Sequence, residues 1–296
     1  EPITFFEILT AAYFLKSSQY PDNINLIESG LFFRFDATNI LKSNLASVIT
    51  SIGLDHLDWL PENEQNVEKI IYEKTSALLK SNIIVAKQSN NEITDCIKKT
   101  ISNNNSNKFF HNENYSFTLK ENNFFYYEDH YGGIKLPIPN IEGQFQLENI
   151  STAIATLRLL DFNIKDKDIK NGIKKIYLKG RLQEIKFGKL KKVLGSSRLV
   201  CDGGHNINSA KAIAKWLKQQ NQDVHLIVGM MKDKDHQGFI ECFNSNIKSI
   251  TIIDIPNQTG AIKKEEFKKK IDKFQKNIYL SNGIEESIKS INKHKN

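Results

Sequence analysis

Short apolar runs that alternate with helical stretches constrain the fold of this chain more than any other feature. Buried-strand patterns lie at residues 24–28, 45–52 and 83–86, and helical spacing covers residues 4–17 and 66–80. Strands that are separated by helices pair side by side in a parallel sheet, which the helices cover. The pattern therefore predicts an α/β protein with a mostly parallel sheet in its first half.

The region between residues 90 and 133 follows a different pattern. A helix is expected first, then an Asn/Ser-rich loop at 102–107, and then aromatic-rich alternating segments near 115–119 and 124–127. This alternation predicts a small antiparallel meander. The consecutive aromatic residues would also suit base stacking, but aromatic residues are common on half-buried strands, and we favour that interpretation.

The alternation of strands and helices begins again after two helical stretches at 147–160 and 165–174. It indicates a second α/β unit, so we predict two domains, at residues 1–178 and 179–296. Two domains also fit the usual domain size for a chain of 296 residues. The predicted strands and helices of the second unit alternate in this order: 198–201, 209–219, 224–228, 236–243, 249–254 and 264–273.

Composition narrows the class of protein. The chain is 40% hydrophobic and 25% charged, as is usual for a folded domain, and no apolar run approaches the roughly 18 residues of a membrane span. No secretory signal pattern is visible. Cys96, Cys201 and Cys242 have neither disulfide nor metal-site spacing, so a cytoplasmic location is expected. The net charge of +7 is spread along the chain, which predicts no nucleic-acid partner.

Two polar motifs stand at the ends of predicted strands, and a third lies on the next predicted helix. Residues 28–39 read Glu-Ser-Gly-Leu-Phe-Phe-Arg-Phe-Asp-Ala-Thr-Asn, residues 50–56 read Thr-Ser-Ile-Gly-Leu-Asp-His, and residues 72–75 read Tyr-Glu-Lys-Thr. Open α/β sheets bind ligands at the carboxyl ends of their strands. Taken alone, Glu28 and His56 are weak candidates for metal ligands, because polar residues at strand ends often only cap loops.

In combination these motifs resemble the folylpolyglutamate and dihydrofolate synthases of the Mur ligase superfamily. The resemblance covers nearly the whole chain in order and includes four later motifs: Gln-Phe-Gln-Leu-Glu-Asn at 144–149, Gly-Arg at 180–181, Asp-Gly-Gly-His-Asn at 202–206, and Gly-Met-Met-Lys-Asp-Lys-Asp at 229–235. It implies a Mur-ligase-like central ATPase domain, followed by a Rossmann-like glutamate-ligase domain.

The resemblance also implies a site, residue by residue. Glu28 and His56 match the Mg²⁺ ligands of the family, and His56 and Lys74 are implied as catalytic. Lys74 matches a lysine that is carbamylated in related ligases, while Lys69 is a competing candidate one helical turn earlier. Contacts to the nucleotide are implied for four residues: Asn149, Arg181, Asp202 and His205.

The implied reaction is an ATP-dependent carbon–nitrogen ligation in folate biosynthesis and one-carbon metabolism. The γ-phosphate of ATP activates a carboxylate of dihydropteroate or folate as an acyl phosphate, and the amine of L-glutamate then attacks it. Such chemistry depends on alignment and charge neutralisation, which Mg²⁺ and Arg181 would supply. The motifs leave open whether the chain adds the first glutamate or extends a polyglutamate tail.

The sequence departs from the family in three places. Residues 1–296 contain no Gly-x-x-Gly-Lys-Ser/Thr loop, Phe32-Phe33 stands where the family carries Gly-Gly, and the last residues form a Lys/Asn-rich helix-like tail. We therefore expect a central domain without its first strand and phosphate-binding loop, with exposed apolar surface. Two interpretations stay open. The chain is a fragment or split partner of a ligase, with the loop supplied by a separate chain, or it is a non-catalytic remnant that acts at most as a binding protein.

Overall fold

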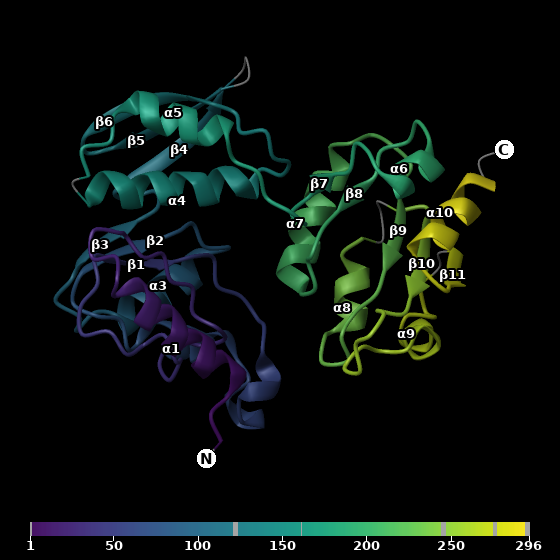
Figure 1. Ribbon diagram of the computed structural model, residues 1–296, viewed down its shortest axis with the longest axis horizontal. Helices are drawn as coiled ribbons and strands as arrows, with labels where there is room; N and C mark the ends of the chain where they lie inside the picture. Colours follow the sequence, from purple (N-terminus) through teal and green to yellow (C-terminus); the bar gives the residue numbers. More distant parts are fainter. Residues whose placement is uncertain (1, 121–123, 161, 244–246, 275–276, 294–296) are drawn as a thin grey trace. The chain divides into compact units, whose positions relative to one another are not determined.

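The chain forms two compact units, and both combine helices with sheets (Figure 1). The first unit comprises Glu1–Pro137 and Glu148–Lys170, and the second comprises Ile138–Leu147 and Asn171–Asn296. Because the two units interleave along the sequence, the simple division at residue 178 stays a prediction. This computed structural model describes residues 2–120, 124–160, 162–243, 247–274 and 277–293.

A three-stranded parallel sheet forms the framework of the first unit. Strands β1 (Ala46–Ile49), β2 (Asn82–Val85) and β3 (Asn107–Phe110) pair in that order. Helix α2 (Val67–Thr75) connects β1 to β2, and α3 (Asn91–Thr100) connects β2 to β3. The first two strands and both helices confirm the predicted α/β pattern.

Branched apolar side chains from these strands and helices fill the space between them. Each such side chain contributes roughly 1.5–3 kcal/mol when it is fully removed from water. Strand β3 was not predicted, because its Asn-rich start hides a short apolar end that only pairing with β2 identifies. The buried members of this core include Ile49, Ile70, Ile71, Ile83, Val85, Ile97 and Phe110.

Helix α1 (Phe5–Ser17) confirms the helix that was predicted at residues 4–17. It begins with a capping box, in which Thr4 and Glu7 satisfy each other's backbone N–H groups. Its apolar residues are largely in solvent, since Phe5 is 75% and Leu15 is 71% exposed. The exposed apolar surface that the sequence predicted for the first domain is therefore present on this helix.

The strand predicted at residues 24–28 is wrong. The segment forms no strand, and Leu26 is 96% exposed. A strand exists only when a neighbour accepts and donates its backbone hydrogen bonds, and in the described ranges no strand pairs with this segment. An apolar composition is typical of strands, but it does not by itself supply the neighbouring strand that pairing requires.

The antiparallel meander was predicted correctly. Strands β4 (Tyr115–Lys120), β5 (Phe124–Asp129) and β6 (Gly132–Pro137) form a sheet in chain order. Along β5 the side chains alternate, with Phe125 and Tyr127 fully buried. This alternation is that of a half-buried sheet face.

Two helices follow the meander, and one of them is bonded to it. Helix α4 (Phe145–Leu159) and helix α5 (Asp166–Lys174) confirm the two predicted helical stretches. The Tyr115 hydroxyl lies 3.0 Å from the Val85 carbonyl and 3.1 Å from the Thr152 hydroxyl. One buried tyrosine thus connects the meander to both the parallel sheet and α4.

The second unit is built on another parallel sheet. Its strands pair in the order β11 (Asn277–Ser281), β10 (Ser249–Ile253) and β9 (His225–Val228). Side chains such as Ile250, Ile252 and Phe267 are fully buried in its core. The helices of this unit are α6 (Lys189–Leu194), α7 (Ile207–Lys218), α8 (His236–Glu241), α9 (Lys264–Lys270) and α10 (Ile284–Lys293). The predicted Rossmann-like alternation from residue 207 onward is confirmed.

One predicted strand of this unit belongs to a different sheet. The run at 198–201 was expected to open the parallel sheet, but β8 (Val200–Cys201) pairs antiparallel with β7 (Gln183–Glu184). Strand β7 follows the Gly-Arg motif at 180–181, and β8 directly precedes the motif at 202–206. This pairing brings two predicted site motifs together, as described below.

None of the helices in the described ranges has both the length and the apolarity that a membrane span requires.

Candidate functional site

The motif at residues 28–39 folds into a loop that closes around Asp36. One carboxylate oxygen of Asp36 accepts the backbone N–H of Gly30 at 2.8 Å, and the other accepts that of Thr38 at 2.9 Å. The Asn39 side chain donates to the Arg34 carbonyl at 3.2 Å. Asp36 and Asn39 therefore fix the shape of the loop. The sequence showed the Asp-Ala-Thr-Asn pattern, but not this role.

The same loop is attached to the carboxyl-terminal end of helix α2. Arg34 donates to both carboxylate oxygens of Glu73, at 2.7 and 2.8 Å. The Glu73 carbonyl also accepts the backbone N–H groups of Phe33 and Arg34, at 3.1 and 2.9 Å. Lys74 Nζ then donates to the Leu31 carbonyl at 2.8 Å. These contacts place the loop motif and Lys74 beside each other.

Lys74 and Lys69 lie in opposite electrostatic environments. Burial lowers the pKa of Lys74, and the nearby Asp55 only partly opposes this. In contrast, hydrogen bonding to Glu64 raises the pKa of Lys69, whose Nζ lies 2.6 Å from Glu64 and 3.3 Å from Glu73. A carbamate forms from a neutral amine, so the environment of Lys74 suits that chemistry, whereas Lys69 is held as a cation.

We expect the Lys74→Met variant to be more stable than the parent. Its free energy of unfolding at pH 7 should be about 1 kcal/mol higher, because the substitution removes a poorly compensated buried cation. The folded protein binds fewer protons at Lys74 than the unfolded chain does, so the gain is largest at low pH and disappears as pH rises above about 10.5. Denaturant titrations at several pH values measure this. The matched Lys69→Met variant should show no such gain, because its carboxylate partners stabilise the Lys69 cation. A destabilised Lys74→Met variant would contradict the assignment.

His56 adopts a left-handed backbone conformation, with φ 57° and ψ 33°, just before the short helix Leu57–Trp59. Its Nε2 lies 3.7 Å from an Asp55 carboxylate oxygen. The ring of Phe32 stands edge-on to the imidazole at 6.5 Å between centroids, and Lys74 Nζ lies 5.6 Å from the centre of the same ring. Phe32 thus occupies space beside both residues that were predicted to be catalytic.

Glu28 is exposed and stands at the start of the loop at residues 28–39, in a segment without regular secondary structure. Within the described ranges, no group of three or more His, Cys, Asp or Glu side chains is arranged to hold a metal ion. Glu28 and His56 therefore do not belong to a preformed cage. To hold Mg²⁺, these two residues would need further ligands from phosphate oxygens and water, which is the usual situation for that ion.

In the second unit, Arg181, Asp202 and His205 converge on two adjoining loops. Asp202 accepts the backbone N–H of Leu182 at 2.7 Å, and the Gly203 N–H donates to the Gly180 carbonyl at 2.8 Å. A side chain at Gly203 would lie 3.0 Å from Nη1 of Arg181. His205 Nδ1 lies 3.0 Å from the Gly203 carbonyl oxygen. Both Arg181 and His205 are exposed.

The motif at residues 229–235 lies next to this cluster. The pKa of Asp233 is lowered, first by a hydrogen bond from Lys234 and in smaller part by the nearby His205. Asp235 accepts the Gly238 N–H at 2.8 Å and so caps helix α8. Asn149 is exposed on α4 and belongs to the first unit, whereas this cluster belongs to the second.

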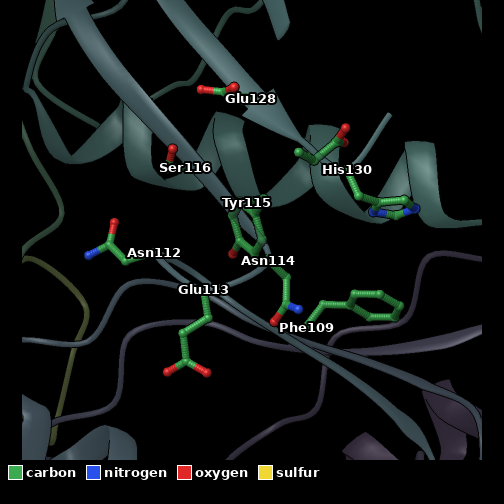
Figure 2. A pocket seen from close by; sticks show the side chains of 9 residues that line it. Phe109, Asn112, Glu113, Asn114, Tyr115, Ser116, Glu128 and His130 are labelled. Atoms are coloured by element: carbon green, nitrogen blue, oxygen red, sulfur yellow. The ribbon is translucent and has the colours of Figure 1, made fainter. Parts of the chain in front are cut away.

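A shallow hollow of about 550 Å³ lies elsewhere, along the meander of the first unit (Figure 2). Glu113 and Glu128 lie on opposite sides of it. Several of its polar groups already have structural partners, because Glu113 pairs with Lys98 and Asp129 pairs with Arg158. None of the predicted site residues lines this hollow.

Comparisons with known proteins identify relatives of this chain. Residues 180–295 match the Mur ligase glutamate ligase domain. The chain is 28% identical over 298 residues to the dihydrofolate synthase/folylpolyglutamate synthase of Buchnera aphidicola subsp. Schizaphis graminum, covering 98% of this chain and 65% of that protein. This chain is a homologue of the dihydrofolate synthase/folylpolyglutamate synthases. Against the Escherichia coli enzyme the identity is 25% over 263 residues, which cover 88% of this chain and 58% of the enzyme. The chain thus spans less than two thirds of these relatives.

Solved structures of the family share the fold. The Escherichia coli FolC in complex with ADP, without folate substrate, superimposes with a TM-score of 0.82 at 22% identity, covering 100% of this chain and 66% of that one. A Mycobacterium tuberculosis folylpolyglutamate synthase complexed with ADP and AMPPCP gives a TM-score of 0.82 at 17% identity, covering 99% and 67%. The predicted α/β fold class is confirmed.

Proposed function

We propose that this chain carries nucleotide and glutamate-ligase elements of an ATP-dependent carbon–nitrogen ligase, which joins L-glutamate to dihydropteroate or folate. The convergence of Arg181, Asp202 and His205 carries the proposal, because these motifs meet within the segment that matches the glutamate ligase domain. The three free cysteines fit a reducing compartment, and we propose the cytoplasm.

The residues have distinct tasks in this proposal. The exposed guanidinium of Arg181 binds phosphate oxygens, for which its planar set of donors is suited. Asn149 and His205 orient the nucleotide. A carboxylate of the pterin substrate attacks the γ-phosphorus, ADP leaves, and the glutamate amine then displaces phosphate from the acyl carbon.

Glu28 and His56 are the residues that would hold Mg²⁺, which when bound neutralises phosphate charge. Lys74, whose pKa burial lowers, is the proposed site of carbamylation. A carbamate there would change the charge of this site from positive to negative, which suits a position next to a metal ion.

Residues 1–296 contain no glycine-rich phosphate loop, so we propose that catalysis needs such a loop from outside these residues, in the same or a separate chain. One observation favours the alternative of a non-catalytic binding protein. Phe32 packs beside Lys74 and His56 and takes up room that a reacting nucleotide would need.

Calorimetric titration of this chain with Mg·ATP, with and without a folate substrate, tests the proposal. The Glu28→Ala/His56→Ala double variant is expected to weaken binding at least about tenfold. The Glu113→Ala/His130→Ala variant, which alters the hollow of the first unit, is the matched control and should bind as the parent does. Equal binding by parent and Glu28/His56 variant would reject the metal assignment, and no binding by the parent would reject nucleotide binding by this chain.

A further inference from the structure

The backbone on both sides of Arg181 is held in the left-handed region. Gly180 has φ 64° and Leu182 has φ 44°. Glycine adopts such angles without cost, but a leucine rarely does, because its Cβ crowds the following carbonyl oxygen. Strained residues of this kind persist only where surrounding contacts enforce them.

Those contacts are present on both sides. The Gly180 N–H donates to the Gln183 side-chain oxygen at 2.9 Å, and the Gly180 carbonyl accepts the Gly203 N–H at 2.8 Å. The Leu182 N–H donates to Asp202 at 2.7 Å, and the Leu182 side chain is only 2% exposed. The exposed Arg181 side chain therefore projects from a backbone that is fixed at both neighbours.

Both carboxylate oxygens of Asp202 accept backbone hydrogen bonds in this arrangement. One accepts the Leu182 N–H at 2.7 Å and the other accepts the Gly204 N–H at 2.6 Å. It therefore bonds two loops to each other through their backbones. This explains why an acidic side chain lies beside a residue that is proposed to bind phosphate, where its negative charge alone would be unfavourable.

We propose that Leu182, held by Asp202, is a positioning residue that fixes the direction of the Arg181 guanidinium toward a phosphate-bearing ligand. This inference rests on the proposed nucleotide site. A guanidinium on a rigid backbone loses less conformational entropy on binding than one on a mobile loop, so the strain at Leu182 is offset by tighter binding.

Limited trypsin digestion tests the rigidity without any nucleotide. Cleavage after Arg181 requires the buried Leu182 to leave its site, so its rate reports the population of the open loop. Leu182→Gly is expected to raise this rate about tenfold relative to other tryptic sites. The control is Leu226→Ala, a partly buried leucine of the same unit, which should leave the relative rate unchanged. An unchanged relative rate in Leu182→Gly would overturn the inference.

A double-mutant cycle with Mg·ADP as the probe tests the positioning itself. Leu182→Gly should weaken ADP binding about tenfold in the parent but have no further effect in the Arg181→Ala background. A merely structural role would lower affinity equally in both backgrounds, and that result would overturn the inference while leaving the proposed function intact. If Arg181→Ala does not weaken binding, or if the parent binds no ADP, the proposed nucleotide site itself fails, and the digestion still decides whether the loop is held.

Discussion

Replacing Arg158 with alanine is expected to lower the free energy of unfolding of the first unit by about 3–5 kcal/mol, because it leaves a buried carboxylate without its cation. Arg158 donates to both oxygens of Asp129, at 2.7 and 2.9 Å. The Asp129 side chain is only 2% exposed, and the buried Tyr127 hydroxyl also donates to it at 3.0 Å. This pair attaches helix α4, which carries Asn149, to the meander, so its loss would also loosen that helix.

The pH dependence of unfolding provides a second test of the same pair. Burial acts to raise the pKa of Asp129, but hydrogen bonds from Arg158, Tyr127 and Tyr131 outweigh it, and the net pKa lies below its ordinary value of 3.8. The folded-state pKa is lowered, so this stabilisation is present above pH 3.8 and is lost as pH falls through the lower value. In the Arg158→Ala variant, only burial and the hydrogen bonds from Tyr127 and Tyr131 still act on Asp129. The pKa of Asp129 should therefore rise, and the free energy of unfolding should begin to fall at a higher pH than in the parent.

Denaturant titrations monitored by circular dichroism measure both effects. Arg198→Ala is the matched control, because the side chains of its partners Glu142 and Glu184 are 41% and 32% exposed, and it should cost less than about 1 kcal/mol. An Arg158→Ala variant that unfolds within about 1 kcal/mol of the parent would show that the buried pair contributes little.

Replacing Glu73 with alanine is expected to cost about 2–4 kcal/mol and to release the loop at residues 28–39 from helix α2. Glu73 is 7% exposed at its side chain and compensates two cations, Arg34 and Lys69. The hydrogen bond from Arg34 is the main cause of its lowered pKa, and burial partly opposes it. This contribution is therefore present above pH 4.5 and is lost at lower pH.

Two measurements separate the stability effect from the release of the loop. Thermal unfolding gives the loss of stability, and trypsin cleavage after Arg34 gives the opening of the loop. Glu68→Ala, an exposed position in the first turn of the same helix, should change neither quantity. If cleavage after Arg34 is as slow in Glu73→Ala as in the parent, the two backbone bonds to the Glu73 carbonyl suffice to hold the loop.

The sequence alone determined the elements that follow from local patterns. Helices α1, α2 and α4 were predictable because caps and apolar spacing act within a few residues, and the meander was predictable from its alternation. The ordered motifs also pointed to the family, since the residues of each motif are neighbours in the chain. The convergence of the motifs at 180–181 and 202–206 is implied by that resemblance and is present in the structure.

Tertiary structure decided whatever depends on a distant partner. The segment at 24–28 has the composition of a strand, but no strand lies beside it in the described residues. In contrast, the polar-flanked β3 is a strand because its backbone pairs with that of β2. Likewise, Lys74 and Lys69 are indistinguishable as lysines on one helix until burial lowers the pKa of the first and carboxylates raise that of the second. Hydrogen-bond pairing and desolvation are properties of the folded surroundings, and no single stretch of sequence contains them.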